Sequence, residues 1–227
     1  MPDFVLAVYL VLVLPTYQLW RSLRSRKATP TPGVGRYLRS IALALAPVVV
    51  VVALWVVEGR SWPALGLGLP LGGVIGLTVA APGLAVVGFL MRRQMTAPTG
   101  PPKAPDGLLP TTPQERTAFL IMGVVVGFAW ELLYRGYLLW VLAPRLGIPL
   151  AVLLAAAAYG AAHGYKTPKQ FAGSLASALV FTLAYVVSHS LWWLMLVHAG
   201  LPVLLVLAGV GVAPRGGSQA IASPEAA

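Results

Sequence analysis

The residues best suited to chemistry lie in the stretch GFAWELLYRGYLL, where a carboxylate and a guanidinium interrupt a run of apolar side chains. Glu131 and Arg135 are four residues apart, so on a helix they share one face and can neutralise each other. A charge at the centre of a bilayer costs at least ~2.5–3.5 kcal/mol, so charged groups there are usually paired and usually functional. Two interpretations stay open at this point: a structural ion pair, or part of a functional site.

Histidines add candidates for catalysis. His163 ends one apolar run and His198 lies inside another. A histidine near a carboxylate can deprotonate a water molecule, and a second histidine can donate a hydrogen bond to a developing oxyanion. Glu131, His163 and His198 could instead bind zinc and leave one position for water. The HExxH motif of helical zinc proteases is absent. No cofactor is therefore certain from the sequence, and a divalent metal such as zinc remains one of the alternatives.

The composition places these residues in a membrane protein. Of 227 residues, 58% are hydrophobic and 10% are charged, against about 25% charged in soluble domains. Cysteine is absent, which excludes disulfides and thiolate chemistry. A spanning helix needs about 20 apolar residues, and the unbroken runs favour an all-α bundle of about seven transmembrane helices. The runs are Phe4–Trp20, Ile41–Val57, Leu71–Met91, Ala118–Val141, Ile148–Ala162, Phe171–Val187 and Leu191–Val212.

The distribution of basic residues predicts a topology. The net charge is +10, and the lysines and arginines gather in alternate loops. The remaining loops hold only Arg60 and Arg145. By the positive-inside rule the N-terminus lies outside and the C-terminus is cytoplasmic, in a multi-pass protein of the cell membrane. Membrane lipids are then the expected surroundings, and nucleic acid is not needed to explain the positive charge.

The chain divides near its proline-rich segment. Residues 1–94 are expected to form a three-helix membrane region, and residues 95–116 a cytoplasmic linker. Residues 117–213 hold nearly all the unusual chemistry and are expected to form a four-helix core. Residues 214–227 read as a polar tail.

Three motifs in the second half resemble the CAAX prenyl protease and bacteriocin-processing family of intramembrane proteases, called CPBP or Abi. The family's first motif is two glutamates, three variable residues and an arginine, and Trp130–Gly136 (WELLYRG) is similar to it. The second is an aromatic residue four positions before a histidine, matched by Tyr159 and His163. The third is a histidine followed four residues later by asparagine or aspartate, and here the pair is His198 and Pro202.

The resemblance implies a hydrolase that cleaves peptide bonds of membrane-associated or lipidated proteins with an activated water. Glu131, His163 and His198 are then the catalytic candidates, and Arg135 and Tyr159 support them. The family's first glutamate is held to activate the water together with the histidine of the second motif. Trp130 stands at that glutamate's position, and an indole cannot accept a proton. Pro202 stands where the family has a polar side chain beside the last histidine.

These departures leave three hypotheses. In the first, Glu131 replaces the missing base, which requires a helix rotation or a bulge because adjacent helical residues point about 100° apart. In the second, the protein is catalytically inactive and serves as a membrane peptide-binding or scaffolding protein. A small proton-coupled transporter ranks third, since acids and histidines within membranes also relay protons.

Overall fold

The computed structural model describes residues 1–24, 33–95 and 110–207, and in these ranges the chain forms helices with short connections and no strand. Seven helical stretches follow the seven predicted apolar runs in order. The first comprises α1 (Pro2–Val8), η1 (Tyr9–Val13) and α2 (Leu14–Arg24), followed by α3 (Val34–Val57), the short turn η2 (Trp62–Leu65) and α4 (Leu71–Met95). The central stretch comprises α5 (Pro113–Trp130), η3 (Glu131–Leu138) and α6 (Leu139–Leu146), and α7 (Ile148–Ala162), α8 (Pro168–Ser188) and α9 (Trp192–Leu207) complete the bundle.

Five of the described stretches are long and apolar enough to cross a membrane. They are Pro2–Arg24, Val34–Val57, Leu71–Gln94, Pro113–Leu146 and Pro168–Ser188. The apolar helices α7 and α9 are shorter. The predicted class, an all-α membrane protein, is therefore confirmed, whereas the seven spans and the orientation of the termini stay predictions.

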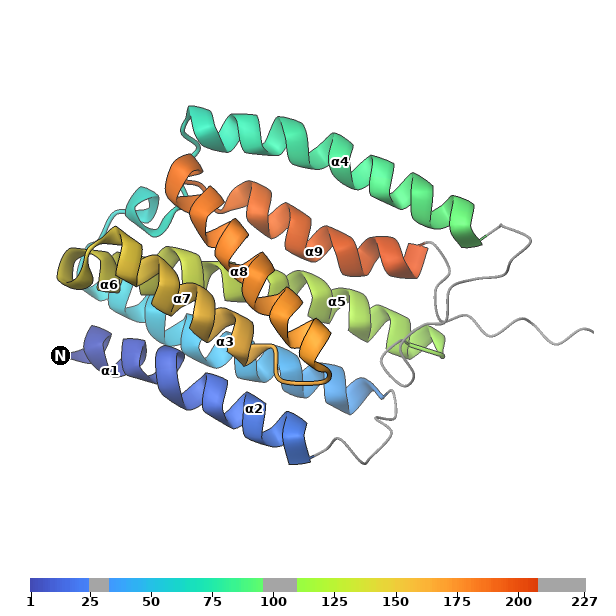
Figure 1. The fold of residues 1–227 in the computed structure, drawn as a ribbon, viewed down its shortest axis with the longest axis horizontal. Coiled ribbons are helices and arrows are strands. Elements are labelled where there is room, and N and C mark those ends of the chain that lie inside the picture. The colour runs from blue at the N-terminus through green and yellow to red at the C-terminus, as the bar shows by residue number, and fades with distance from the viewer. Residues whose placement is uncertain (25–32, 96–109, 208–227) are drawn as a thin grey trace, which may run out of the picture.

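The first three helical stretches pack among the later ones (Figure 1). Within the described ranges, α2 lies against α7, α3 against α5, and α4 against α9. The helices of residues 1–94 thus pack directly against the helices of the predicted four-helix core. Of the predicted linker, residues 96–109 lie outside the described ranges. Helix α5 begins at Pro113, where Thr112 and Glu115 cap its first turn reciprocally.

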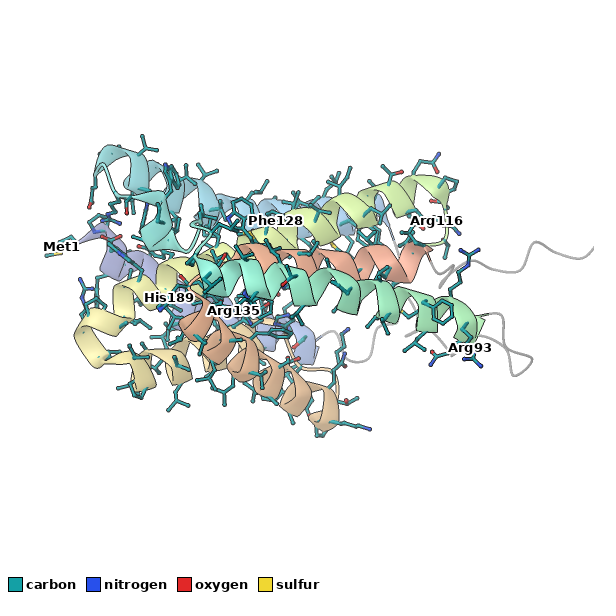
Figure 2. The ribbon with its side chains drawn as sticks, turned by 90° about the horizontal axis from the view of Figure 1, so that it is seen from above. Met1, Arg93, Arg116, Phe128, Arg135 and His189 are labelled. Atoms are coloured by element: carbon teal, nitrogen blue, oxygen red, sulfur yellow. The ribbon has the colours of Figure 1, made fainter. Side chains whose placement is uncertain are left out.

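The two ends of the bundle differ in charge. Arg93, at the end of α4, and Arg116, at the start of α5, lie at the end opposite Met1 (Figure 2). The last turn of α2 carries Arg21 and Arg24 and points toward the same end, although it stops short of the ends of α4 and α5 (Figure 1). This arrangement is what the loop charges of the sequence lead one to expect.

Glycines allow α5 to approach α9 closely. A Cβ atom on Gly123 would lie 2.9 Å from Cβ of Pro202, and one on Gly127 would lie 3.1 Å from the backbone nitrogen of Ala199. Small residues four apart allow helices to pack closely in this way. Pro202, the residue that departs from the family's third motif, therefore has a packing role against α5.

The central stretch changes its winding where the charged residues begin. Residues Glu131–Leu138 form a π-helix, and every residue in it is buried. π-Helical turns are rare and occur often at functional sites. The segment that carries Glu131 and Arg135 therefore departs from regular α-helical winding.

Candidate functional site

Glu131 and Arg135 form the predicted ion pair in the centre of the bundle. Their side chains are only 3% and 2% exposed, and Nη1 of Arg135 donates to Oε2 of Glu131. The Arg135 guanidinium also lies 4.3 Å from the ring centroid of Tyr159, a cation–π contact. Its Nε atom finds no hydrogen-bond partner among the described residues. One carboxylate oxygen of Glu131 is therefore occupied by a cation from its own helix.

The other carboxylate oxygen, Oε1, binds groups from two other helices. His198 Nδ1 on α9 lies 2.9 Å from it, and the Tyr159 hydroxyl on α7 lies 3.3 Å from it. The same hydroxyl is 2.9 Å from His198 Nδ1. A carboxylate paired with arginine only accepts hydrogen bonds, so His198 must carry its proton on Nδ1. Nε2 of a neutral His198 is then left as a lone-pair base.

His163 follows the last turn of α7 and is oriented by that turn. Its Nδ1 lies 2.9 Å from the carbonyl oxygen of Tyr159. A carbonyl is only an acceptor, so Nδ1 donates and Nε2 of the neutral ring is again the basic nitrogen. The His163 and His198 rings are nearly parallel, at 21°, with their centroids 6.4 Å apart. The structure thus brings both predicted histidines to one place, but Glu131 bonds only His198.

Trp130 fills the space beside His163. The two ring centroids are 5.0 Å apart in an edge-to-face arrangement. The indole also contacts Tyr159 and Tyr134, with centroids 5.6 Å and 5.7 Å away. Tyr134 in turn donates its hydroxyl proton to the carbonyl of Leu10, 3.2 Å away, which connects this aromatic group to the first helical stretch. His163 therefore has an aromatic ring as its neighbour where the resembling family has a carboxylate.

The site does not fit a zinc ion. Among the described residues, no three side chains of the histidine, cysteine or carboxylate type come together as a ligand set. Glu131 and His198 bond each other directly, and a guanidinium occupies the remaining carboxylate oxygen. A divalent cation there would be repelled by the guanidinium of Arg135.

Sequence reasoning missed a second polar cluster, at the end of the bundle that holds Met1. Arg60 binds Asp3 through two hydrogen bonds of 2.9 Å and 2.6 Å, and Tyr137 of η3 donates to the same carboxylate at 2.8 Å. The guanidinium lies over the rings of Trp140 and Trp55, at 4.5 Å and 5.2 Å. Hydrogen bonds to Asp3 raise the pKa of Arg60 above its usual range. The only sequence signal was that Asp3 and Arg60 were both expected at the same membrane face.

One of the comparisons with known proteins gives a match. Residues 112–204 match the family model described as type II CAAX prenyl endopeptidase Rce1-like. This part of the chain belongs to the CAAX protease family. The matched region contains the site residues on α5, η3, α7 and α9. Membership of this family also supports the conclusion that the chain is a membrane protein. No curated protein and no solved structure matches the chain at a significant level.

Proposed function

We propose that the protein is an intramembrane endopeptidase of the CAAX type, with Glu131 and His198 as its working pair. The observation that carries the proposal is the 2.9 Å contact between Glu131 Oε1 and His198 Nδ1. A buried carboxylate that accepts from Nδ1–H holds an imidazole in the tautomer whose Nε2 is basic, and stabilises the imidazolium once it forms. Its substrates are peptide bonds of membrane-associated or lipidated proteins, and its location is the cell membrane.

The reaction needs one water molecule and no other reagent. His198 Nε2 takes a proton from the water while the oxygen adds to the carbonyl carbon of the scissile bond. The resulting imidazolium gives that proton to the leaving nitrogen, and the carbon–nitrogen bond breaks to yield a carboxylic acid and an amine. His198 is the more accessible member of the pair, because its side chain is 27% exposed, whereas Glu131 is 3% exposed. Glu131 therefore acts through His198 and does not act on the water directly.

Two residues position this pair. Arg135 keeps Glu131 ionised by pairing with its second oxygen. Tyr159 reaches both members of the pair with one hydroxyl, at 3.3 Å from Glu131 Oε1 and 2.9 Å from His198 Nδ1. The hydroxyl stands where the family usually has phenylalanine. It supplies His198 with a polar neighbour that Pro202 cannot provide.

A second candidate function is peptide binding without cleavage. The observation in its favour is Trp130, which packs its indole edge-to-face against His163. Among the residues that the structure describes, no carboxylate pairs with this histidine as the family's first glutamate would. If the Glu131–His198 pair does not activate water, the site keeps the shape of a protease and lacks its base.

The test is cleavage of quenched-fluorescent lipidated peptides by the purified protein in liposomes. Four variants are compared with the unmodified protein: Glu131→Gln, His198→Asn, His163→Asn and Trp130→Glu. We expect cleavage by the unmodified protein, loss of cleavage in Glu131→Gln and His198→Asn, and measurable residual cleavage in His163→Asn. Fluorescence anisotropy of the same peptides measures binding in parallel.

Two outcomes would contradict this assignment. Cleavage only by Trp130→Glu, abolished again in Trp130→Glu with His163→Asn, would show an intact cleft without a base. Together with peptide binding by the unmodified protein, that result would establish the second candidate. Cleavage by the unmodified protein that depends on His163 and survives His198→Asn would keep the enzyme but reject His198 as its base.

A further inference from the structure

Two apolar grooves run side by side on the bundle, separated by Val124, Phe128 and Trp192, which line both of them. We call these three residues the Phe128 ridge; Phe128 itself is labelled in Figure 2. The first groove, of about 600 Å³, lies between α4, α5 and α9, and the second, of about 440 Å³, lies between α3, α5 and α9. Both volumes are in the ~300–1,000 Å³ range of small-ligand sites.

The first groove is about one membrane leaflet long. Its lining on α9 runs from Trp192 to Val203, which is roughly 16 Å at the helical rise of 1.5 Å per residue. Half of a hydrocarbon core is about 15 Å. The groove begins near Leu69 and Trp192, at the end of the bundle opposite Arg93 and Arg116, and tryptophan is typical of a membrane–water boundary.

The lining chemistry favours hydrocarbon chains. Neither groove has a charged or hydrogen-bonding side chain in its wall apart from the indole of Trp192, whose Nε1 donates to the carbonyl of Leu67. An extended peptide in such a groove would leave its backbone N–H and C=O groups unpaired, which is costly in a membrane. A fatty acyl chain has no such groups.

The ridge distinguishes between apolar occupants. Val124, Phe128 and Trp192 are each 38–41% exposed, so they project between the grooves. A partner helix is about 10 Å wide with its side chains and would rest on the ridge without filling either groove. A single chain would fill one groove. Two chains joined at one end would fill both.

We infer that the paired grooves bind one diacyl membrane lipid, with one acyl chain on each side of the Phe128 ridge and the head group near Trp192. The second groove extends to Ala129 and Leu132, which flank Glu131 in sequence. The bound lipid therefore packs against the helical stretch that carries Glu131. This inference does not depend on whether the protein cleaves peptides.

Photo-crosslinking tests the inference on the full chain in phosphatidylglycerol liposomes. The probe is a phosphatidylcholine with a diazirine in one acyl chain, and mass spectrometry maps the crosslinked residues. Leu45→Trp fills the second groove and Val203→Trp fills the first. Val180→Trp is the matched control, because Val180 lies on α8, is 62% exposed and lines neither groove.

We expect crosslinks in both grooves of the unmodified protein and of Val180→Trp. Because one lipid spans both grooves, each filling variant should lower crosslinking in the opposite groove too, by about tenfold, or about 1.4 kcal/mol. Loss confined to the filled groove would indicate two separate single chains and would overturn the inference. Crosslinking no stronger in the grooves than on α8 would overturn it as well.

A competition experiment avoids the variants, in case one of them does not fold. An unlabelled diacyl phospholipid should remove the crosslinks from both grooves at lower concentration than a lysophospholipid or an isoprenoid alcohol. Equal or better competition by either single-chain compound would contradict a two-chain site.

Discussion

Glu131 carries its charge inside an apolar bundle with hydrogen-bond partners on three helical segments: Arg135 on η3, Tyr159 on α7 and His198 on α9. Each partner offsets part of the cost of removing a carboxylate from water. The residues are therefore coupled, and the effect of changing one depends on the others. Substitutions at these positions have to be interpreted as changes to a network.

Removal of the arginine alone should destabilise the protein strongly. In Arg135→Leu, Glu131 loses its counter-ion while it stays buried, and breaking a buried pair in this way typically costs about 3–5 kcal/mol. The double variant Glu131→Leu with Arg135→Leu removes both charges and should recover most of that loss. Unfolding in detergent, followed by circular dichroism, measures both. Equal destabilisation of the single and double variants would mean that packing, and not charge, is responsible.

Tyr159→Phe should separate positioning from folding. It removes the hydroxyl that contacts both Glu131 and His198 and restores the family's usual ring. Hydrogen bonds to charged groups contribute about 1.5–3 kcal/mol, so we expect kcat to fall roughly tenfold or more while KM stays nearly constant. The ¹⁵N resonances of His198 should shift as well, which a purely structural change elsewhere would not produce.

The matched control is Tyr134→Phe. Tyr134 belongs to the same aromatic group, but its hydroxyl bonds the carbonyl of Leu10 and not the site. This variant should lose some stability and keep its kcat and the His198 resonances. If both tyrosine variants lower kcat alike, the Tyr159 hydroxyl has no specific part in positioning.

The sequence predicts some of this network and not the rest. The spacing of Glu131 and Arg135 predicts that they pair, because residues four apart are neighbours on one face of a helix. Which histidine bonds Glu131 depends on distances between α7, α9 and η3, which no local pattern contains. For the same reason Tyr159 could be named as a supporting residue, while its bridging of Glu131 and His198 could not be foreseen.

At the scale of elements, η3 decides where these side chains point. The sequence shows that Glu131 needs a rotation or a bulge to take part, since Trp130 and Glu131 point about 100° apart on a regular helix. It does not show that eight residues wind as a π-helix. Gly136 in this segment approaches η2 closely, since an added Cβ would lie 2.5 Å from the carbonyl oxygen of Leu65.

Gly136→Ala tests whether this approach holds η3 in place. The new methyl group would also lie 3.1 Å from Leu191 Cδ1, so the backbone has to shift. Overpacking of this kind typically costs 1–3 kcal/mol. Gly83→Ala on α4 is the control, because its Cβ would meet nothing within 4 Å and alanine is favoured over glycine in helices by about 1 kcal/mol. Thermal unfolding that leaves Gly136→Ala as stable as Gly83→Ala would rule out the contact.

At the scale of the whole molecule, the order of the helical stretches and the separation of charge are readable from the sequence. The apolar runs give the former, and the arginines and lysines of alternate loops give the latter. The packing of α2, α3 and α4 against α7, α5 and α9 is not readable, because small and apolar surfaces of many helices are compatible with one another. The Asp3–Arg60–Tyr137 cluster adds a polar contact between the first helix and η3.

The positive-inside rule predicts the orientation of this bundle in the membrane, and that orientation can be measured directly. The chain contains no cysteine. Each single cysteine substitution therefore creates one labelling position, and no native cysteine has to be removed first. Ser61 lies in the connection before η2, at the arginine-poor end, and Gln114 lies in the first turn of α5, at the arginine-rich end; both are exposed. Because cytoplasmic loops retain lysine and arginine, a membrane-impermeant maleimide should label Ser61→Cys in intact cells. Gln114→Cys should react only after permeabilisation, and the opposite pattern would reverse the predicted topology.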